Sequence, residues 1–302
     1  MSTTAYIFPG QGSQYVGMGK DLSDKNTIAN ELFEKADNIL GFSLSSICFD
    51  GPEQDLKQTK NTQPAIFLHS VIISKLIGRH DVAMVAGHSL GEYSALVYAG
   101  ALSFEDGLKI VRLRGELMQR AGELQPGTMA AVVGLEASIL EAICTEASAE
   151  GIVQCANFNS PGQIVISGSV AGVKKGMELA KARGAKLVKE LVVSGAFHSP
   201  LMEYAVEGLS SALDAVEIKD AQIPVYANVT AQPVTKADEI RQLLKDQLTK
   251  PVRWEESVKN MVGAGAHKFI EIGPGKVLQG LVKRIEASAE TAGIDKFTEI
   301  GE

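Results

Sequence analysis

The chain has 302 residues, of which 45% are hydrophobic, 22% charged and 6% aromatic. This length and composition exclude a disordered chain and a small disulfide-stapled scaffold, and they predict one or two hydrophobic cores. A formal net charge of -7 argues against nucleic-acid binding as the main role of the protein, so we expect no nucleic-acid partner.

The cysteines and the hydropathy of the chain predict its cellular compartment. The three cysteines, Cys48, Cys144 and Cys155, show no C-x-x-C spacing and favour a reduced intracellular protein. The first residues, MSTTAYIFPGQG, have no basic segment followed by an apolar one, and no apolar run approaches the roughly 20 residues that span a bilayer. We therefore expect a soluble, cytoplasmic protein without a membrane partner.

Strand and helix patterns alternate along most of the chain. Apolar runs at 5–8, 82–86 and 268–272 are each followed by a glycine-rich loop, as strands of a parallel sheet are. Helical patterns occupy the residues 28–40, 63–79, 91–99, 104–120, 199–214, 236–248 and 254–263. The alternation predicts a doubly wound, mostly parallel α/β sheet with helices on both faces, similar to the core of an α/β-hydrolase.

The segment 127–196 has a different order of elements. It reads as strand 128–135, helix 136–150, strand 152–159, strand 163–169, helix 170–184 and strand 186–193. This β-α-β-β-α-β order predicts a ferredoxin-like subdomain inserted into an α/β core of residues 1–126 and 197–302. A cleft between the insert and the core is the expected ligand site.

The sequence Gly87-His88-Ser89-Leu90-Gly91 matches G-x-S-x-G and stands between an apolar strand and a helix. The glycines permit the tight turn that lifts the serine hydroxyl above the sheet, and the helix N-terminus favours developing negative charge there. We therefore expect Ser89 to be a nucleophile. An ordinary turn serine is the alternative.

A serine nucleophile needs a base, which is most often a histidine. In the chain order of the open-sheet hydrolases the base follows the serine, which leaves His198 and His267. His267 begins a predicted strand at the far end of the sheet, whereas His198 lies in the return from the insert to the core. We expect His198 to be the base, and the alternative is a helix N-terminal histidine followed by Ser199 and Pro200.

Arg114 falls within the apolar sector of the predicted helix 104–120, where a guanidinium group needs a partner. Two explanations stay open: an ion pair with a carboxylate of this chain, or a fork that binds a carboxylate of the substrate. Gln11 lies in the loop after the first strand. Its backbone N–H and that of Leu90 could form an oxyanion hole, with a plain turn as the alternative.

No sequence pattern indicates a cofactor or a metal. No G-x-G-x-x-G follows a strand, residues 273–276 lack the spacing of a phosphate loop, and no histidine pair has ligand spacing. We therefore expect no dinucleotide, nucleoside triphosphate or metal site.

Several blocks of the sequence resemble the malonyl-CoA:acyl carrier protein transacylases of type II fatty acid synthesis and the acyltransferase domains of polyketide synthases. They occur in the family's order as FPGQGSQ (8–14), TQPAI (62–66), GHSLGEYSAL (87–96), RLRGELM (112–118), NFNSPGQIVISG (157–168), FHSPLM (197–202), PVRW (251–254) and EIGPGKVLQGL (271–281). The resemblance implies that Ser89 takes the acyl group, that His198 is its base and that Arg114 pairs with the free carboxylate of malonate.

The resemblance also assigns the surroundings of these residues. It implies an oxyanion hole from Gln11 and Leu90, and a backbone carbonyl near Gln247 that holds His198 in place of an acidic side chain. His88, Asn157, Asn159 and Phe197 would line the cleft, and a phenylalanine before the catalytic histidine resembles the malonyl-type pattern.

The partners implied are malonyl-CoA and acyl carrier protein, with ping-pong transfer through a malonyl-serine, no cofactor, and action as a monomer. Because acyl carrier proteins are acidic, we expect a basic docking face on the insert, although a solvated helix face is the alternative. The residues of that face are Lys174, Lys175, Lys181, Arg183, Lys186 and Lys189. A serine thioesterase or esterase, a polyketide-pathway acyltransferase and an inactive module that binds CoA or carrier protein stay open.

Overall fold

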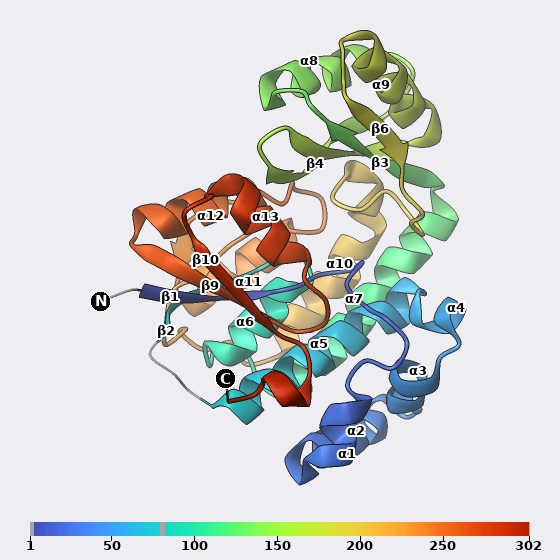
Figure 1. Ribbon diagram of the computed structural model, residues 1–302. Coiled ribbons are helices and arrows are strands. Elements are labelled where there is room, and N and C mark those ends of the chain that lie inside the picture. The colour runs from blue at the N-terminus through green and yellow to red at the C-terminus, as the bar shows by residue number, and fades with distance from the viewer. Residues whose placement is uncertain (1–2, 79–81, 302) are drawn as a thin grey trace.

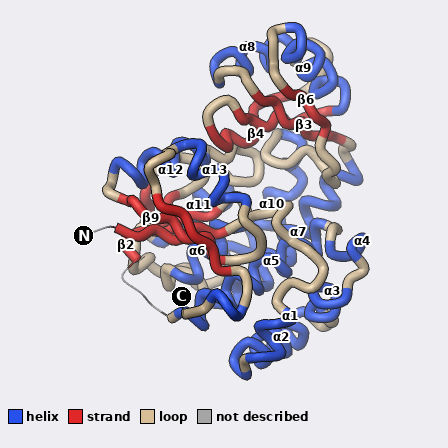
Figure 2. The backbone as a smooth tube through the Cα atoms, viewed as in Figure 1, coloured by secondary structure: helices blue, strands red, loops and turns tan. Residues whose placement is uncertain are grey.

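Two β-sheets form the framework of the molecule (Figures 1 and 2). The computed structural model describes residues 3–78 and 82–301. In the order in which they lie side by side, the strands of the larger sheet are β10 (Glu290–Ile294), β9 (Ala266–Ile272), β1 (Thr3–Phe8), β2 (Val82–Gly87), β7 (Val225–Tyr226) and β8 (Pro233–Val234). Neighbouring strands run parallel, except for β7 and β8, so the predicted mostly parallel sheet is confirmed.

The helices of the core pack on the two faces of this sheet or against one another. They are α1 (Lys20–Lys25), α2 (Thr27–Leu40), α3 (Leu44–Asp50), α4 (Glu53–Leu56), α5 (Thr59–Ile77), α6 (Gly91–Tyr98), α7 (Phe104–Leu124), α10 (Glu203–Ala215), α11 (Ala237–Asp246), α12 (Trp254–Gly263) and α13 (Val277–Ile285). In β1, Ala5 and Ile7 belong to one buried cluster with α12 and α13, whereas Tyr6 and Phe8 belong to another with α5, α6 and α7. This alternation is that of a strand buried on both faces. Among the described residues, no helix has both the length and the apolar character to cross a membrane.

The smaller sheet belongs to the insert and lies above the core in Figure 1. Its elements are β3 (Gly127–Val133), α8 (Ala137–Ala147), β4 (Val153–Ser160), β5 (Gln163–Ser169), α9 (Val170–Ala182) and β6 (Leu187–Glu190). The strands are antiparallel in the order β4-β5-β3-β6, which is the order of a ferredoxin-like fold. Both helices pack on one face of this sheet around a separate apolar cluster. The predicted fold of the insert is confirmed, and its limits at residues 127 and 196 stay a prediction.

Helix α5 begins earlier than predicted, at Thr59, so that Pro64 lies inside it. Proline has no N–H to donate to the carbonyl of Lys60, and that carbonyl instead accepts a hydrogen bond from Arg112 Nη1 at 2.9 Å. Arg112, in the neighbouring helix α7, thus replaces the hydrogen bond that the proline cannot donate. Arg79, the last residue of the predicted helix, lies outside the described residues.

Short elements are the other difference from the prediction. Helices α1, α3, α4 and α13 and strands β7, β8 and β10 were not predicted. Most of them are too short or too polar to show a clear period, whereas α13 (VLQGLVKRI) has a helical apolar period that the prediction did not use. The edge strand β10, for example, has the sequence ETAGI and no fully buried residue. The predicted helix 199–214 begins as a 3-10 turn at Pro200–Met202, before α10.

Candidate active site

Strand β2 ends at Gly87 and helix α6 begins at Gly91, so the G-x-S-x-G motif forms a tight strand-to-helix turn. A Cβ on Gly87 would lie 1.9 Å from the carbonyl carbon of Gly91, and one on Gly91 would lie 2.0 Å from the carbonyl oxygen of Phe8. Ser89 has a φ of 49°, a left-handed conformation that costs a non-glycine residue about 1–3 kcal/mol. The structure therefore holds Ser89 in a strained position rather than in an ordinary turn.

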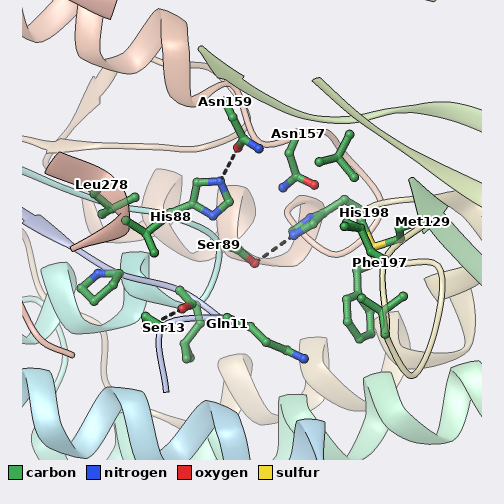
Figure 3. Close-up of a pocket in the computed structure, with 18 of the residues that line it drawn as sticks. Gln11, Ser13, His88, Ser89, Met129, Asn157, Asn159, Phe197, His198 and Leu278 are labelled. Atoms are coloured by element: carbon green, nitrogen blue, oxygen red, sulfur yellow. Dashed lines mark hydrogen bonds between the residues drawn. The ribbon is translucent and has the colours of Figure 1, made fainter. Parts of the chain in front are cut away.

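His198 lies next to this serine, as Figure 3 shows. Its Nε2 is 2.8 Å from Ser89 Oγ, and its Nδ1 is 2.8 Å from the backbone carbonyl oxygen of Gln247. Because a carbonyl oxygen only accepts, Nδ1 carries the hydrogen and Nε2 is free to accept the proton of the serine. The residue does precede a short helical turn capped by Ser199, but its side chain reaches the nucleophile rather than that turn.

The surroundings of His198 favour the neutral imidazole. Burial lowers the pKa of His198 to about 3, and the positive charge of Arg114 adds to this effect. Burial also lowers the pKa of His88, whose Nε2 lies 2.9 Å from Asn159 Oδ1 in the insert. A neutral His198 is the form that can take a proton at ordinary pH.

Arg114 is only 1% exposed and points toward the same serine. Its Nη1 donates to Gln63 Oε1 at 2.8 Å, and its Nη2 donates to Gln247 Oε1 at 2.9 Å and to Ser89 Oγ at 3.1 Å. These partners are all neutral oxygens, and in the part of the chain that the structure describes Arg114 forms no ion pair, whereas Arg112 pairs with Glu116. Arg114 therefore has no direct ion-pair partner among the described residues, although the buried carboxylate of Glu92, linked to it through Gln247, acts on its charge. A buried guanidinium that is not directly bonded to a carboxylate is suited to receive one from a ligand.

These groups face a pocket of about 280 Å³ that lies between the core and the insert (Figure 3). The residues predicted for the site that line it are Gln11, His88, Ser89, Leu90, Arg114, Asn157, Asn159, Phe197 and His198. Gln247 lies behind the pocket and contacts three of its lining residues, Arg114, His198 and the backbone carbonyl of Ser89. Most of the other lining residues are apolar, among them Met118, Met129, Val165, Leu191, Val193, Val277, Leu278 and Leu281. A small acyl chain with a charged end fits such a lining.

Comparison with known proteins agrees with this arrangement. Residues 5–301 match the acyl transferase domain family. The chain belongs to this family. It is 48% identical over 297 residues to the malonyl CoA-acyl carrier protein transacylase of Bacillus subtilis (strain 168), which covers 97% of this chain and 94% of the relative.

Solved structures of similar proteins have the same fold throughout. An acyl carrier protein S-malonyltransferase from Vibrio cholerae has a TM-score of 0.94 and 42% identity, covering 98% of this chain and 98% of the other. A malonyl-transacylase in complex with its type II PKS acyl-carrier protein has a TM-score of 0.95 and 39% identity, covering 99% of this chain and 98% of the other. The fold of this acyl transferase, with its insert, is therefore shared along the whole chain.

In this acyl transferase, two backbone N–H groups are available beside the nucleophile. Gln11 and Leu90 both line the pocket, and within the described residues neither backbone N–H donates a hydrogen bond. The side chain of Gln11 points elsewhere, since its Nε2 donates to Thr59 Oγ1 at 3.3 Å. The loop after β1 and the start of α6 thus present two free donors at one edge of the sheet, as an oxyanion hole requires.

Three buried polar residues of the site were missed in the sequence. Gln63 holds Arg114, Asn228 holds the backbone of Ser89, and Glu92 holds Asn228 and Gln247. Gln63 gave no distinct signal, because it lies among other buried polar residues, Asn61 and Thr62, near the start of α5. Asn228 follows a strand of only two residues and gave no signal either.

Proposed function

We propose that this chain transfers a malonyl group from malonyl-CoA to the phosphopantetheine thiol of acyl carrier protein, in fatty acid biosynthesis. The observation that carries the proposal is Arg114, a buried guanidinium whose hydrogen-bond partners are all neutral and which lies 3.1 Å from the Ser89 hydroxyl. A Ser–His pair alone is suited to many acyl groups. A cation buried beside that pair selects an acyl group that ends in a carboxylate, and the names of the relatives support malonate.

In the first half-reaction, Ser89 Oγ attacks the thioester carbonyl of malonyl-CoA while its proton moves to His198 Nε2. The oxyanion accepts hydrogen bonds from the backbone N–H groups of Gln11 and Leu90. The carbon–sulfur bond then breaks, and the leaving sulfur of CoA takes the proton from His198. The Gln247 carbonyl stabilises the imidazolium by accepting from Nδ1. A malonyl ester of Ser89 remains.

In the second half-reaction, the phosphopantetheine thiol gives its proton to His198 and attacks the ester carbonyl. The carbon–oxygen bond to Ser89 breaks, and Oγ takes the proton back from His198. Every reacting group apart from the substrates is supplied by the chain, so the proposed reaction needs no cofactor and no metal. Its two halves are the same chemistry run in opposite directions, which is a ping-pong mechanism.

Arg114 has two tasks in this scheme. It binds the free carboxylate of malonyl-CoA, and it keeps the malonyl ester oriented until the second thiol arrives. His88, Asn157, Asn159 and Phe197 complete the pocket around the acyl group. Removing one partner of a buried charge pair costs about 2–5 kcal/mol.

For the carrier protein we propose the basic face of the insert, on α9 and β6. Lys175 and Arg183 form ion pairs with Glu178 and Glu146, so part of their charge is already compensated. The exposed residues Lys174, Lys181, Lys186 and Lys189 are therefore the main attraction for an acidic partner. We also propose that the chain acts as a monomer in the cytoplasm, which agrees with its free cysteines Cys48, Cys144 and Cys155.

Mass spectrometry of the intact protein after brief exposure to malonyl-CoA tests this function. We expect one malonyl adduct on Ser89, absent from Ser89→Ala, that added pantetheine thiol discharges and water does not. Rapid discharge by water would indicate a thioesterase, and an unlabelled protein that still binds CoA would indicate an inactive binding module. Discharge rates with carrier proteins of fatty acid and polyketide synthesis, compared side by side, distinguish the two pathways.

A further inference from the structure

Asn228 holds the turn that carries Ser89, although the proposed reaction does not use it. Its Oδ1 accepts a hydrogen bond from the backbone N–H of Ser89 at 2.7 Å, and its Nδ2 donates to the carbonyl oxygen of Gly87 at 2.6 Å. Its side chain is 0% exposed and does not line the pocket. The buried side-chain amide of Asn228 thus bridges the backbone N–H of Ser89 and the backbone carbonyl of Gly87.

The topology of the sheet explains how Asn228 reaches this position. Strands β2 and β7 are parallel neighbours, with Ala86 beside Tyr226. Both strands end at the same edge of the sheet, so position 228 lies beside the turn that follows β2. The antiparallel strand β8 then returns the chain, with Ala227 N donating to Gln232 O at 3.0 Å.

Asn228 is itself held by Glu92, a buried residue in the first turn of α6. Glu92 Oε2 accepts from the backbone N–H of Asn228 at 3.0 Å and from Gln247 Nε2 at 2.8 Å. The backbone carbonyl of Gln247 in turn accepts from His198. Glu92 Oε2 therefore links Asn228, which holds the Ser89 turn, to Gln247, which holds His198.

We propose that Asn228 is a positioning residue that keeps the strained Ser89 turn in hydrogen-bonding register with His198. The inference rests on the proposed function, because its expected effect is on acylation of Ser89. A left-handed φ of 49° persists only where the surrounding structure enforces it. Without the amide, the peptide groups at Gly87 and Ser89 lose that support, and Ser89 Oγ shifts away from His198 Nε2.

The test is the single-turnover rate of Ser89 acylation by malonyl-CoA in Asn228→Ala, measured by rapid quench and intact mass. We expect a loss on the order of 10²-fold, the effect of a displacement of about 1 Å at a reacting group. The affinity for malonyl-CoA, measured by calorimetry in a Ser89→Ala background, should stay within twofold, because Asn228 does not touch the pocket. An unchanged acylation rate, or an equal loss of rate and affinity, would overturn the proposal.

Asn260→Ala is the matched control. Asn260 Nδ2 donates to the carbonyl oxygen of Ala231 at 2.8 Å, in the same loop but away from Ser89. This variant loses an asparagine–backbone hydrogen bond of the same kind and should acylate within twofold of the wild type. A loss as large as that of Asn228→Ala would show that only the loop's stability matters, and would overturn the positioning role.

A second variant and a second assay test the positioning role even if Asn228→Ala does not fold or malonyl-CoA is not the substrate. If Asn228→Ala does not fold, the isosteric Asn228→Asp keeps the acceptor for Ser89 N–H but loses the donor to Gly87 O, and we expect a loss of about tenfold. Labelling of Ser89 by a serine-directed fluorophosphonate reports the same loss with no acyl donor involved. Normal labelling of both variants would contradict the positioning role, whereas a wild type that labels but is not malonylated would contradict the proposed function alone.

Discussion

The core and the insert hold their residues of the pocket in different ways. In the core, the backbone N–H, the backbone carbonyl and the hydroxyl of Ser89 all have side-chain partners, in Asn228, Gln247 and His198. In the insert, Asn159 contacts the core through one hydrogen bond to His88. The core therefore holds the reacting atoms at hydrogen-bonding distance, whereas the insert shapes the space around the acyl group.

The largest effect in this comparison is expected for Arg114→Ala, a change within the core. Loss of a buried partner for the malonyl carboxylate costs about 2–5 kcal/mol, which is roughly a 30-fold to 4,000-fold loss of malonyl transfer. Acetyl transfer has no carboxylate to lose and should change far less. Acylation rates with malonyl-CoA and acetyl-CoA measure both, and Arg120→Ala, an exposed arginine of the same helix, is the control. Equal losses for the two donors would make Arg114 merely structural.

Gln154→Ala removes a contact by which the insert supports the base. Gln154 Nε2, on β4, donates to the backbone carbonyls of His198 at 2.9 Å and Thr249 at 3.2 Å. We expect a loss of about fivefold in kcat, since the neutral hydrogen bond to the His198 carbonyl is worth about 1 kcal/mol. The KM for malonyl-CoA should not change. A change in KM without one in kcat would mean that the insert acts only on the acyl group.

Charge reversal on the insert is expected to have a smaller effect. Lys181→Glu with Lys186→Glu should raise the KM for acyl carrier protein about threefold to tenfold at low salt, because rim charges act mainly on encounter. High salt should remove most of the difference. Steady-state kinetics with carrier protein and with free pantetheine as acceptors measure it, and the pantetheine rate is the control. An unaltered KM at low salt would exclude this face as the docking surface.

The smallest expected effect is that of pH on the base. Burial lowers the folded-state pKa of His198 to about 3, so the neutral base stays fully populated between pH 8 and pH 5. An unperturbed histidine with a pKa near 6.5 would lose roughly 30-fold of its neutral form at pH 5. We therefore expect a nearly flat acylation rate over this window.

Two other effects of pH can be distinguished from the protonation of the base: a change in stability and the titration of Glu92. The unfolded chain protonates His198 near pH 6.5 and the folded chain only near 3, so stability should fall as the pH is lowered through this range. Burial raises the pKa of Glu92 to about 7, so an inflection near pH 7 that disappears in Glu92→Gln belongs to Glu92. A 30-fold fall by pH 5 that persists in Glu92→Gln would contradict a buried neutral base.

The sequence predicted features of the site that depend on local geometry or on chain order. The turn at Ser89 follows from two glycines between a strand and a helix. The order of serine and base left His198 and His267, and His198 was chosen because it lies in the return from the insert to the core. The insert was predicted because its strands and helices are regular and long. Arg114 was located by helical period, but only the structure shows that no carboxylate of the described residues pairs with it.

The residues that hold the catalytic side chains in place could not be predicted from the sequence, because their roles depend on tertiary packing. Asn228 matters only because β7 lies beside β2 in a given register, and a strand of two residues leaves no periodic pattern. Gln63 reaches Arg114 because α5 packs against α7, an arrangement that neither helix encodes alone. The start of α5 was predicted too late, at residue 63, because Pro64 is unusual inside a helix. In the structure, Arg112 of the neighbouring helix bonds to the carbonyl that Pro64 leaves without a helical partner.

The most direct test of the central claim is a crystal structure of the protein trapped after reaction with malonyl-CoA in the absence of an accepting thiol. Our account predicts a malonyl ester on Ser89 Oγ, with its carbonyl oxygen directed at the N–H groups of Gln11 and Leu90 and its carboxylate paired with both Nη atoms of Arg114. A carboxylate that points to solvent, with Arg114 still bound only to Gln63 and Gln247, would contradict it.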